Sequence, residues 1–152
     1  MLFPTHLLVA ASLRRWSQLS PVWLAVGAAV PDLLDKPLGM LGVLDLFQTV
    51  GHSALTAVVL LPLAWYSRDG AAVAVGWVSH LLLDALHVVI NGRPTDALFL
   101  GWPLVVPPDP LRAPPGPFVE QYLGTPAFYL EVAIWLVVGG VFAAERLAAR
   151  PE

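Results

Sequence analysis

The chain has 152 residues, enough for one domain of ordinary size, and we expect residues 1–152 to form a single membrane-embedded domain. Hydrophobic residues make up 57% of it and charged residues only 12%, about half the share typical of soluble proteins. This composition excludes a disordered chain and a typical cytosolic enzyme, and it indicates a protein of the lipid bilayer. The net charge of −3 gives no sign of nucleic-acid binding, and without cysteine there is no thiolate metal site.

Five apolar stretches follow in chain order. Residues 2–13 and 21–30 are shorter than the roughly 20 residues that span a bilayer core, so they predict two short helices. Residues 49–66, 71–90 and 127–144 are long enough to span, and each carries at most one acidic residue. We therefore expect an all-α, polytopic membrane bundle of about five helices, with three full spans and two short N-terminal helices.

A long connection, residues 91–126, separates the last two predicted spans. Seven of the seventeen residues at positions 101–117 are proline, which removes amide donors and disfavours a regular helix. Because lipid cannot satisfy an irregular backbone, we expect this Pro-rich loop to lie at the membrane interface or outside it.

Arginines indicate the orientation of the bundle. If the helices alternate in direction, five of them fall on one face, which is expected to be cytoplasmic: Arg14, Arg15, Arg68, Arg146 and Arg150. The chain is thus expected to be an integral protein of the inner or plasma membrane, surrounded by membrane lipids.

The most informative stretch is residues 79–87. Offsets of four and seven residues put His80, Asp84 and His87 within about 60° on one helix face. An Asp at the centre of a membrane helix costs roughly 2.5–3.5 kcal/mol, a cost that is offset if the group faces the bundle interior and binds something. This helix alone is compatible with a metal site and with a buried His–Asp hydrogen bond that joins two helices.

The other histidines favour a site. His6 falls near the outer end of the first helix, and His52 falls one turn into the predicted span at residues 49–66. Asp32 and Asp35 end the second apolar stretch on the same outer side. All four histidines of the chain and three acids can therefore converge on the outer half of the bundle. Glu131, alone on the last helix, is interpreted as a hydrogen-bonded or interfacial carboxyl group.

Imidazole and carboxylate ligands without thiolate suit zinc best, with manganese or iron(II) as alternatives. Seven candidates exceed what one ion requires, so either two ions bind or some candidates orient the ligands or accept a proton. A bound metal would lower the pKa of its water to about 7, which predicts a hydrolase acting on an ester or phosphoester of a small molecule or lipid. The alternatives are a proton or divalent-cation transporter and a non-catalytic metal- or haem-binding membrane protein.

The order of these motifs resembles a known family. The pattern runs through His6, Pro31-Asp32-Leu33-Leu34-Asp35, Gly51-His52-Ser53, Ser79-His80-Leu81-Leu82-Leu83-Asp84 and Trp102-Pro103. In this order it resembles the YdjM-like family of predicted membrane-bound metal-dependent hydrolases, also described as LexA-binding inner-membrane-associated proteins. The resemblance implies a metal site formed by His6, Asp32, His52, His80 and Asp84. We take Asp35 and His87 as the candidate catalytic residues; since relatives tend to carry a small polar residue in place of His87, it could also serve as a replacement ligand.

The same order of ligands is more distantly similar to zinc-dependent phospholipase C and the related fungal single-strand nucleases. Those enzymes carry a further His-x-x-x-Glu helix downstream, whereas no histidine follows His87 here. The similarity therefore implies one or two ions instead of three. It also implies that Asp84 bridges two ions, with His6 belonging to the second.

Overall fold

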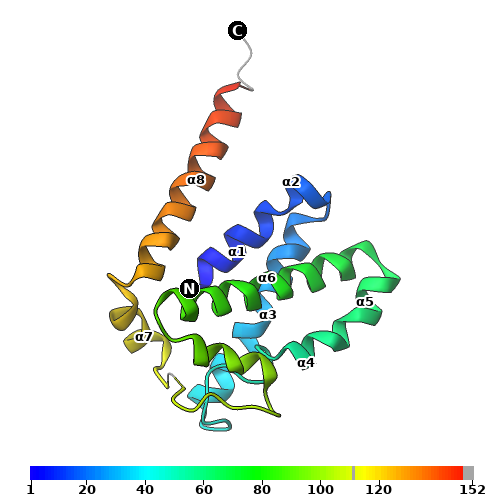
Figure 1. The fold of residues 1–152 in the computed structure, drawn as a ribbon. Coiled ribbons are helices and arrows are strands. Elements are labelled where there is room, and N and C mark those ends of the chain that lie inside the picture. The colour runs from blue at the N-terminus through cyan, green and yellow to red at the C-terminus, as the bar shows by residue number, and fades with distance from the viewer. Residues whose placement is uncertain (111, 149–152) are drawn as a thin grey trace.

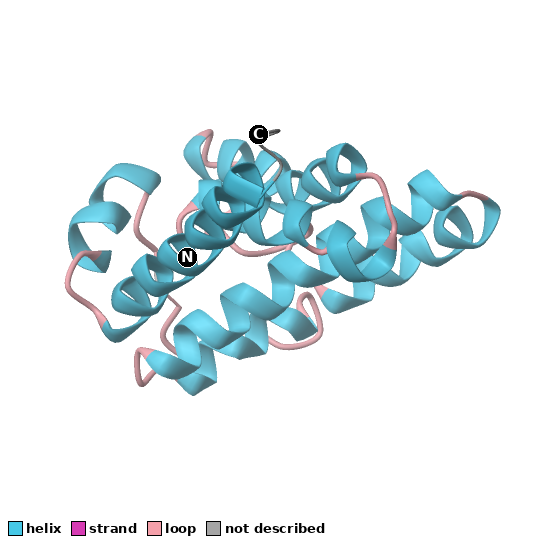
Figure 2. Ribbon diagram, turned by 90° about the horizontal axis from the view of Figure 1, so that it is seen from above, coloured by secondary structure: helices cyan, strands magenta, loops and turns pink. Residues whose placement is uncertain are grey.

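The computed structural model describes residues 1–110 and 112–148. Throughout this part of the chain the regular structure is helical (Figures 1 and 2), which confirms the all-α prediction. In chain order the elements are α1 (Phe3–Ser12), α2 (Arg14–Ser17), α3 (Pro21–Met40), α4 (Ala54–Ala57), the 3-10 helix η1 (Val58–Leu60), α5 (Leu61–Tyr66), α6 (Arg68–Ile90), the 3-10 helix η2 (Pro94–Gly101), α7 (Pro115–Tyr122) and α8 (Pro126–Ala148). Arg150, one of the five arginines on the expected cytoplasmic face, lies outside the described residues.

Helices α3 and α6 form the centre of the fold, and α1 packs against both (Figure 1). Glycines set how closely α3 and α6 approach. A Cβ atom on Gly76 would lie 2.0 Å from the carbonyl oxygen of Leu24, and one on Gly27 would lie 2.1 Å from that of Val73. Only residues without a side chain allow this separation, so the two helices that carry most of the candidate ligands are held backbone to backbone.

The prediction of three full spans is wrong for residues 49–66. Within the described residues, two helices are long and apolar enough to cross a membrane, α6 and α8. Residues 49–53 form a loop whose backbone amides donate to Asp35, so the helical segment begins only at Ala54. From there to Tyr66 it is about 20 Å long, well short of a hydrocarbon core of about 30 Å.

Helix α3 is twice as long as the apolar stretch at residues 21–30 that predicted it. It continues through Pro31 and Pro37, past the end of the helix that the apolar stretch predicted. Proline removes one helical hydrogen bond, but Pro31 is buried directly beneath Gly51, and this packing compensates for the loss. As a result Asp32 and Asp35 project from one continuous helix.

The connection at residues 91–126 is more regular than expected, because it contains η2 and α7. Helix α7 begins inside the Pro-rich stretch, with Pro115 and Pro117 in its first turn, where a backbone amide has no helical partner in any case. Helix α8 then leads to the C-terminal end of the described chain (Figure 1), where Glu145 pairs with Arg15 of α2 at 2.8 Å. Its residues Leu136 and Val137 are 71% and 65% exposed, so α8 carries apolar surface that the rest of the protein does not cover.

Candidate metal centre

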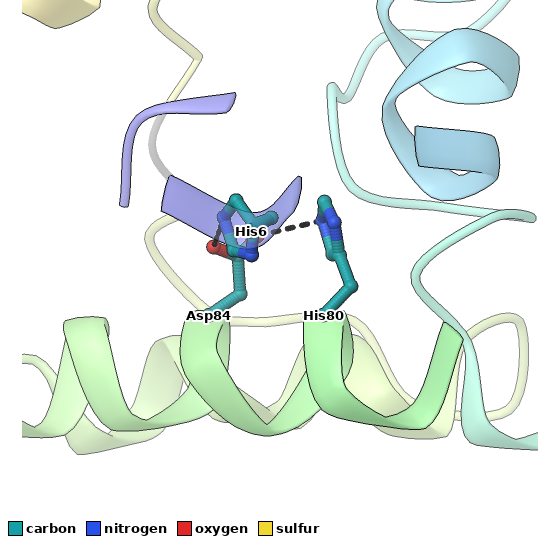
Figure 3. A group of neighbouring side chains, drawn as sticks. All are labelled: His6, His80 and Asp84. Atoms are coloured by element: carbon teal, nitrogen blue, oxygen red, sulfur yellow. Dashed lines mark ion pairs between the residues drawn. The ribbon is translucent and has the colours of Figure 1, made fainter. Parts of the chain in front are cut away.

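Side chains from three helices and one loop meet at the centre of the fold. His6 comes from α1, Asp32 from α3, His52 from the loop before α4, and His80 and Asp84 from α6. Figure 3 shows His80 and Asp84, one turn apart on α6, both directed toward His6. The structure therefore brings together all five residues that the resemblance implies as ligands. His52 and His80 have no exposed surface.

Two carboxylate oxygens lie close to the Nε2 atoms of His52 and His80. The Nε2 atom of His52 lies 3.1 Å from Nε2 of His80, 3.5 Å from Oδ1 of Asp32 and 3.4 Å from Oδ2 of Asp84. The Nε2 atom of His80 lies 3.6 Å from the same Asp84 oxygen and 4.0 Å from Oδ1 of Asp32. Distances of 3.1–4.0 Å between donor atoms are of the size expected when each ligand lies about 2.1 Å from a shared zinc ion.

The other ring nitrogen of each histidine is held by an acceptor. Nδ1 of His80 lies 2.7 Å from the carbonyl oxygen of Ala28, and Nδ1 of His52 lies 2.7 Å from Oδ2 of Asp35. Because a carbonyl and a carboxylate only accept, each Nδ1 carries the proton, and each Nε2 keeps its lone pair available for a cation. These partners fix the tautomer and ring orientation that a metal ligand requires.

Asp35 is placed as a positioning group for His52. It has no exposed surface, and its two oxygens accept hydrogen bonds from the backbone amides of Thr49 (2.6 Å), Gly51 (2.9 Å) and His52 (3.2 Å) as well as from the His52 ring. Burial would raise the pKa of Asp35, but the His52 ring and these amides outweigh it and lower the pKa below its usual value. The carboxylate is thus ionised and fully engaged.

The centre has an excess of negative charge. Burial would lower the pKa of His52, but hydrogen bonds to Asp32, Asp35 and Asp84 outweigh it and raise that pKa to about 10. Burial would likewise raise the pKa of Asp32, yet the His52 hydrogen bond and the Lys36 ammonium hold it well below its usual range. The surroundings of His52 Nε2 therefore favour a positive occupant, either a proton or a metal ion.

The second oxygen of Asp84 faces a different set of groups. Oδ1 lies 3.1 Å from Nε2 of His6 and 3.1 Å from the backbone nitrogen of Met1. The Met1 nitrogen in turn lies 2.9 Å from Nδ1 of His87. The His6 ring stacks on His80 with the ring centroids 3.8 Å apart. Asp84 thus contacts His52 and His80 through one oxygen and His6 through the other, the arrangement that a bridging carboxylate needs.

A cavity of about 500 Å³ adjoins the centre. Asp32, Asp84 and His87 border it, whereas His52, His80 and Asp35 do not. Of the two candidate catalytic residues, His87 can therefore meet a ligand in the cavity and Asp35 cannot.

Two polar residues beside the centre were not anticipated. Gln48 donates a hydrogen bond from Nε2 to Oδ2 of Asp84 (3.0 Å), and Nζ of Lys36 lies 3.4 Å from Oδ1 of Asp32. Lys36 follows Asp32 by four residues, a spacing that brings two side chains together on a helix. The pair was missed because the predicted helix ended at Val30. Nothing in the local sequence marks Gln48, because it reaches Asp84 from an irregular loop.

Glu131 forms a separate buried contact. Its carboxylate, only 4% exposed, accepts hydrogen bonds from the backbone amide of Leu2 (3.2 Å) and from the hydroxyl groups of Thr5 and Tyr122. Burial and the Glu131 charge raise the pKa of Tyr122, which therefore stays a hydrogen-bond donor. Glu131 thus connects α8 and α7 to α1, the helix that carries His6.

Two further motifs of the resemblance, Gly51-His52-Ser53 and Trp102-Pro103, are also in contact. The Ser53 hydroxyl donates a hydrogen bond to the carbonyl oxygen of Trp102 (2.5 Å). No family model, curated protein or solved structure matches the chain.

Proposed function

We propose that the protein is a membrane-bound, metal-dependent hydrolase that acts on an ester or phosphoester. The observation that carries the proposal is the cluster of two buried imidazole nitrogens, oriented by Asp35 and the Ala28 carbonyl, with carboxylate oxygens of Asp32 and Asp84 beside them. The YdjM-like pattern supports the same class of activity. The exposed apolar surface of α8 supports a location in the inner or plasma membrane, with the centre on its outer side.

Each residue has a distinct role in this proposal. Asp32, His52, His80 and Asp84 would hold one divalent cation, zinc by its preference for such ligands, and Oδ1 of Asp84 together with His6 would offer a position for a second. When bound, the cation lowers the pKa of a coordinated water to about 7. Asp32 and Asp84 are the ligands that border the cavity, so water and substrate reach the centre from their side. His87 borders the same cavity and can accept or donate a proton there.

A closed, structural metal site is the second candidate, because four protein ligands are what such sites have. In that case the metal would stabilise the bundle without turnover. The adjoining cavity and the surplus of ionisable residues around it favour catalysis instead.

Metal analysis of the purified, detergent-solubilised protein tests the proposal. We expect at least one zinc, manganese or iron ion per chain, and release of p-nitrophenol from p-nitrophenyl phosphate, its diester or p-nitrophenyl acetate. His80→Ala and Asp84→Asn should lose both metal and turnover. Asp69→Asn, the same change at an exposed position of α6, should lose neither. Folded wild-type protein that binds no metal would overturn the proposal. Bound metal without turnover would overturn the hydrolase and favour the closed, structural metal site.

A further inference from the structure

The polar groups of the cavity gather at its metal end. Gln48 and Lys36 border the cavity and contact Asp84 and Asp32, so their amide and ammonium groups lie beside the proposed ligands. Much of the remaining wall is apolar and includes Phe3, Leu33, Phe47, Val88, Phe118 and Val119. A ligand that fits this cavity has a polar head at the centre and a hydrocarbon part beyond it.

The apolar wall continues to the outside of the protein. Leu33 is 63% exposed, Phe3 38% and Val119 37%, although all three border the cavity. Such a rim is unfavourable in water and favourable in contact with lipid. It suits a ligand whose hydrocarbon chain enters from a bilayer.

The positive charge of Lys36 indicates the charge of the ligand's polar head. Among the described residues that border the cavity it is the one Lys or Arg, and its side chain is 31% exposed. Its partners in the structure are the Phe47 carbonyl oxygen at 3.5 Å and Asp32, a carboxylate that a bound metal would neutralise. The ammonium group would then be free to pair with an anionic oxygen of the ligand. A phosphoryl group supplies that oxygen, whereas a neutral carboxylic ester does not.

We infer that the substrate is a phosphorylated amphiphile, with its phosphoryl group between the metal centre and Lys36 and its hydrocarbon chain in the cavity. The inference rests on the proposed function. In the reaction the oxygen of water bonds to phosphorus, and the bond between phosphorus and the leaving oxygen breaks. One proton of the water goes to the leaving oxygen and the other to solvent.

A chain-length series tests this inference. The probes are alkyl p-nitrophenyl phosphates from methyl to dodecyl, assayed with the metal-loaded protein below their micelle concentrations. We expect kcat/KM to rise about fourfold per methylene until the cavity is filled. No turnover of any phosphate or ester probe would overturn the proposed function itself. Turnover without dependence on chain length would overturn this inference alone, and so would faster turnover of the matching p-nitrophenyl alkanoates.

Two variants test where the hydrocarbon chain and the phosphoryl group of the ligand bind. Val119→Trp places a large ring in the cavity wall, and the ratio of dodecyl to methyl kcat/KM should fall about tenfold or more. Gln121→Trp, exposed on the same helix and away from the cavity, should leave that ratio unchanged. Lys36→Met should lower kcat/KM about tenfold for phosphates and not for alkanoates, with metal content retained. Equal ratios in both Trp variants, or equal losses for both probe classes in Lys36→Met, would overturn the inference.

Discussion

The Nε2 atoms of His52 and His80 face each other at 3.1 Å, and both rings are fully buried. Because each Nδ1 donates its proton elsewhere, the two facing nitrogens can share a proton or a metal ion in a space that solvent does not reach. A single cation between them, also contacting Asp32 and Asp84, would satisfy all four groups. The proposed metal centre depends on this relationship, and several measurements test it.

Asp35→Asn should weaken zinc binding about 10- to 100-fold, the usual effect of losing a carboxylate behind a ligand histidine. The reason is that an amide accepts a weaker hydrogen bond from the His52 ring and leaves that ring free to rotate or change tautomer. The measurement is zinc affinity by competition with a chromophoric chelator.

Asp45→Asn is the matched control, since Asp45 is exposed in the loop after α3. Thermal unfolding of both variants separates a local effect on His52 from loss of the fold. Wild-type affinity in a folded Asp35→Asn protein would contradict the role of Asp35 as a positioning group.

Metal binding should release protons. The pKa of His52 is raised from its ordinary value of 6.5 to about 10, so the metal-free protein keeps a proton on this ring at neutral pH. A metal at Nε2 must displace that proton, and its apparent affinity should fall about tenfold for each unit by which the pH decreases. Calorimetric titrations at pH 7.5 in buffers of different ionisation enthalpy measure the release. Binding without any proton release would show that His52 is not a ligand.

Much of the centre could be predicted from the sequence because the key information is local. His80 and Asp84 are one helical turn apart in an otherwise apolar helix, and such a helix tolerates them only when they face the interior. The resemblance added His6, Asp32 and His52, which the structure places beside His80 and Asp84. The all-α class followed from apolar stretches of helical length.

The predictions that failed depended on tertiary contacts. Residues 49–53 contain no Asp, Glu, Lys or Arg, so the sequence allowed them in a span, but three of their amides donate to Asp35, a residue 14 to 17 positions away. Likewise, α3 continues through Pro31 because this residue packs beneath Gly51. Neither contact can be predicted from the conformational propensities of neighbouring residues. For the same reason Gln48 and the contact of Glu131 with Tyr122 were not anticipated.

Gly76→Ala should destabilise the protein by at least about 1–3 kcal/mol and weaken metal binding. The new methyl group would collide with the Leu24 carbonyl and push α3 away from α6, which separates Asp32 from His80. Gly139→Ala is the control, because a Cβ there meets nothing within 4 Å and alanine is the better helix former. Thermal unfolding and chelator competition measure both effects. A Gly76→Ala protein as stable as Gly139→Ala would contradict the close packing of the two helices.

Glu131→Ala should loosen α7 and α8 from the rest of the fold. The substitution leaves the Leu2 amide and the hydroxyl groups of Thr5 and Tyr122 without their acceptor, at a cost of about 1–3 kcal/mol for each buried group that stays unsatisfied. Hydrogen exchange in α7 and the first turns of α8 should therefore accelerate. Glu120→Ala, which removes an exposed carboxylate of α7, should leave it unchanged. Tyr122→Phe should fall between the two, because it removes one donor and keeps the aromatic contact with His87 at 5.1 Å. If all three variants exchange at the wild-type rate, Glu131 does not hold α7 and α8 against α1.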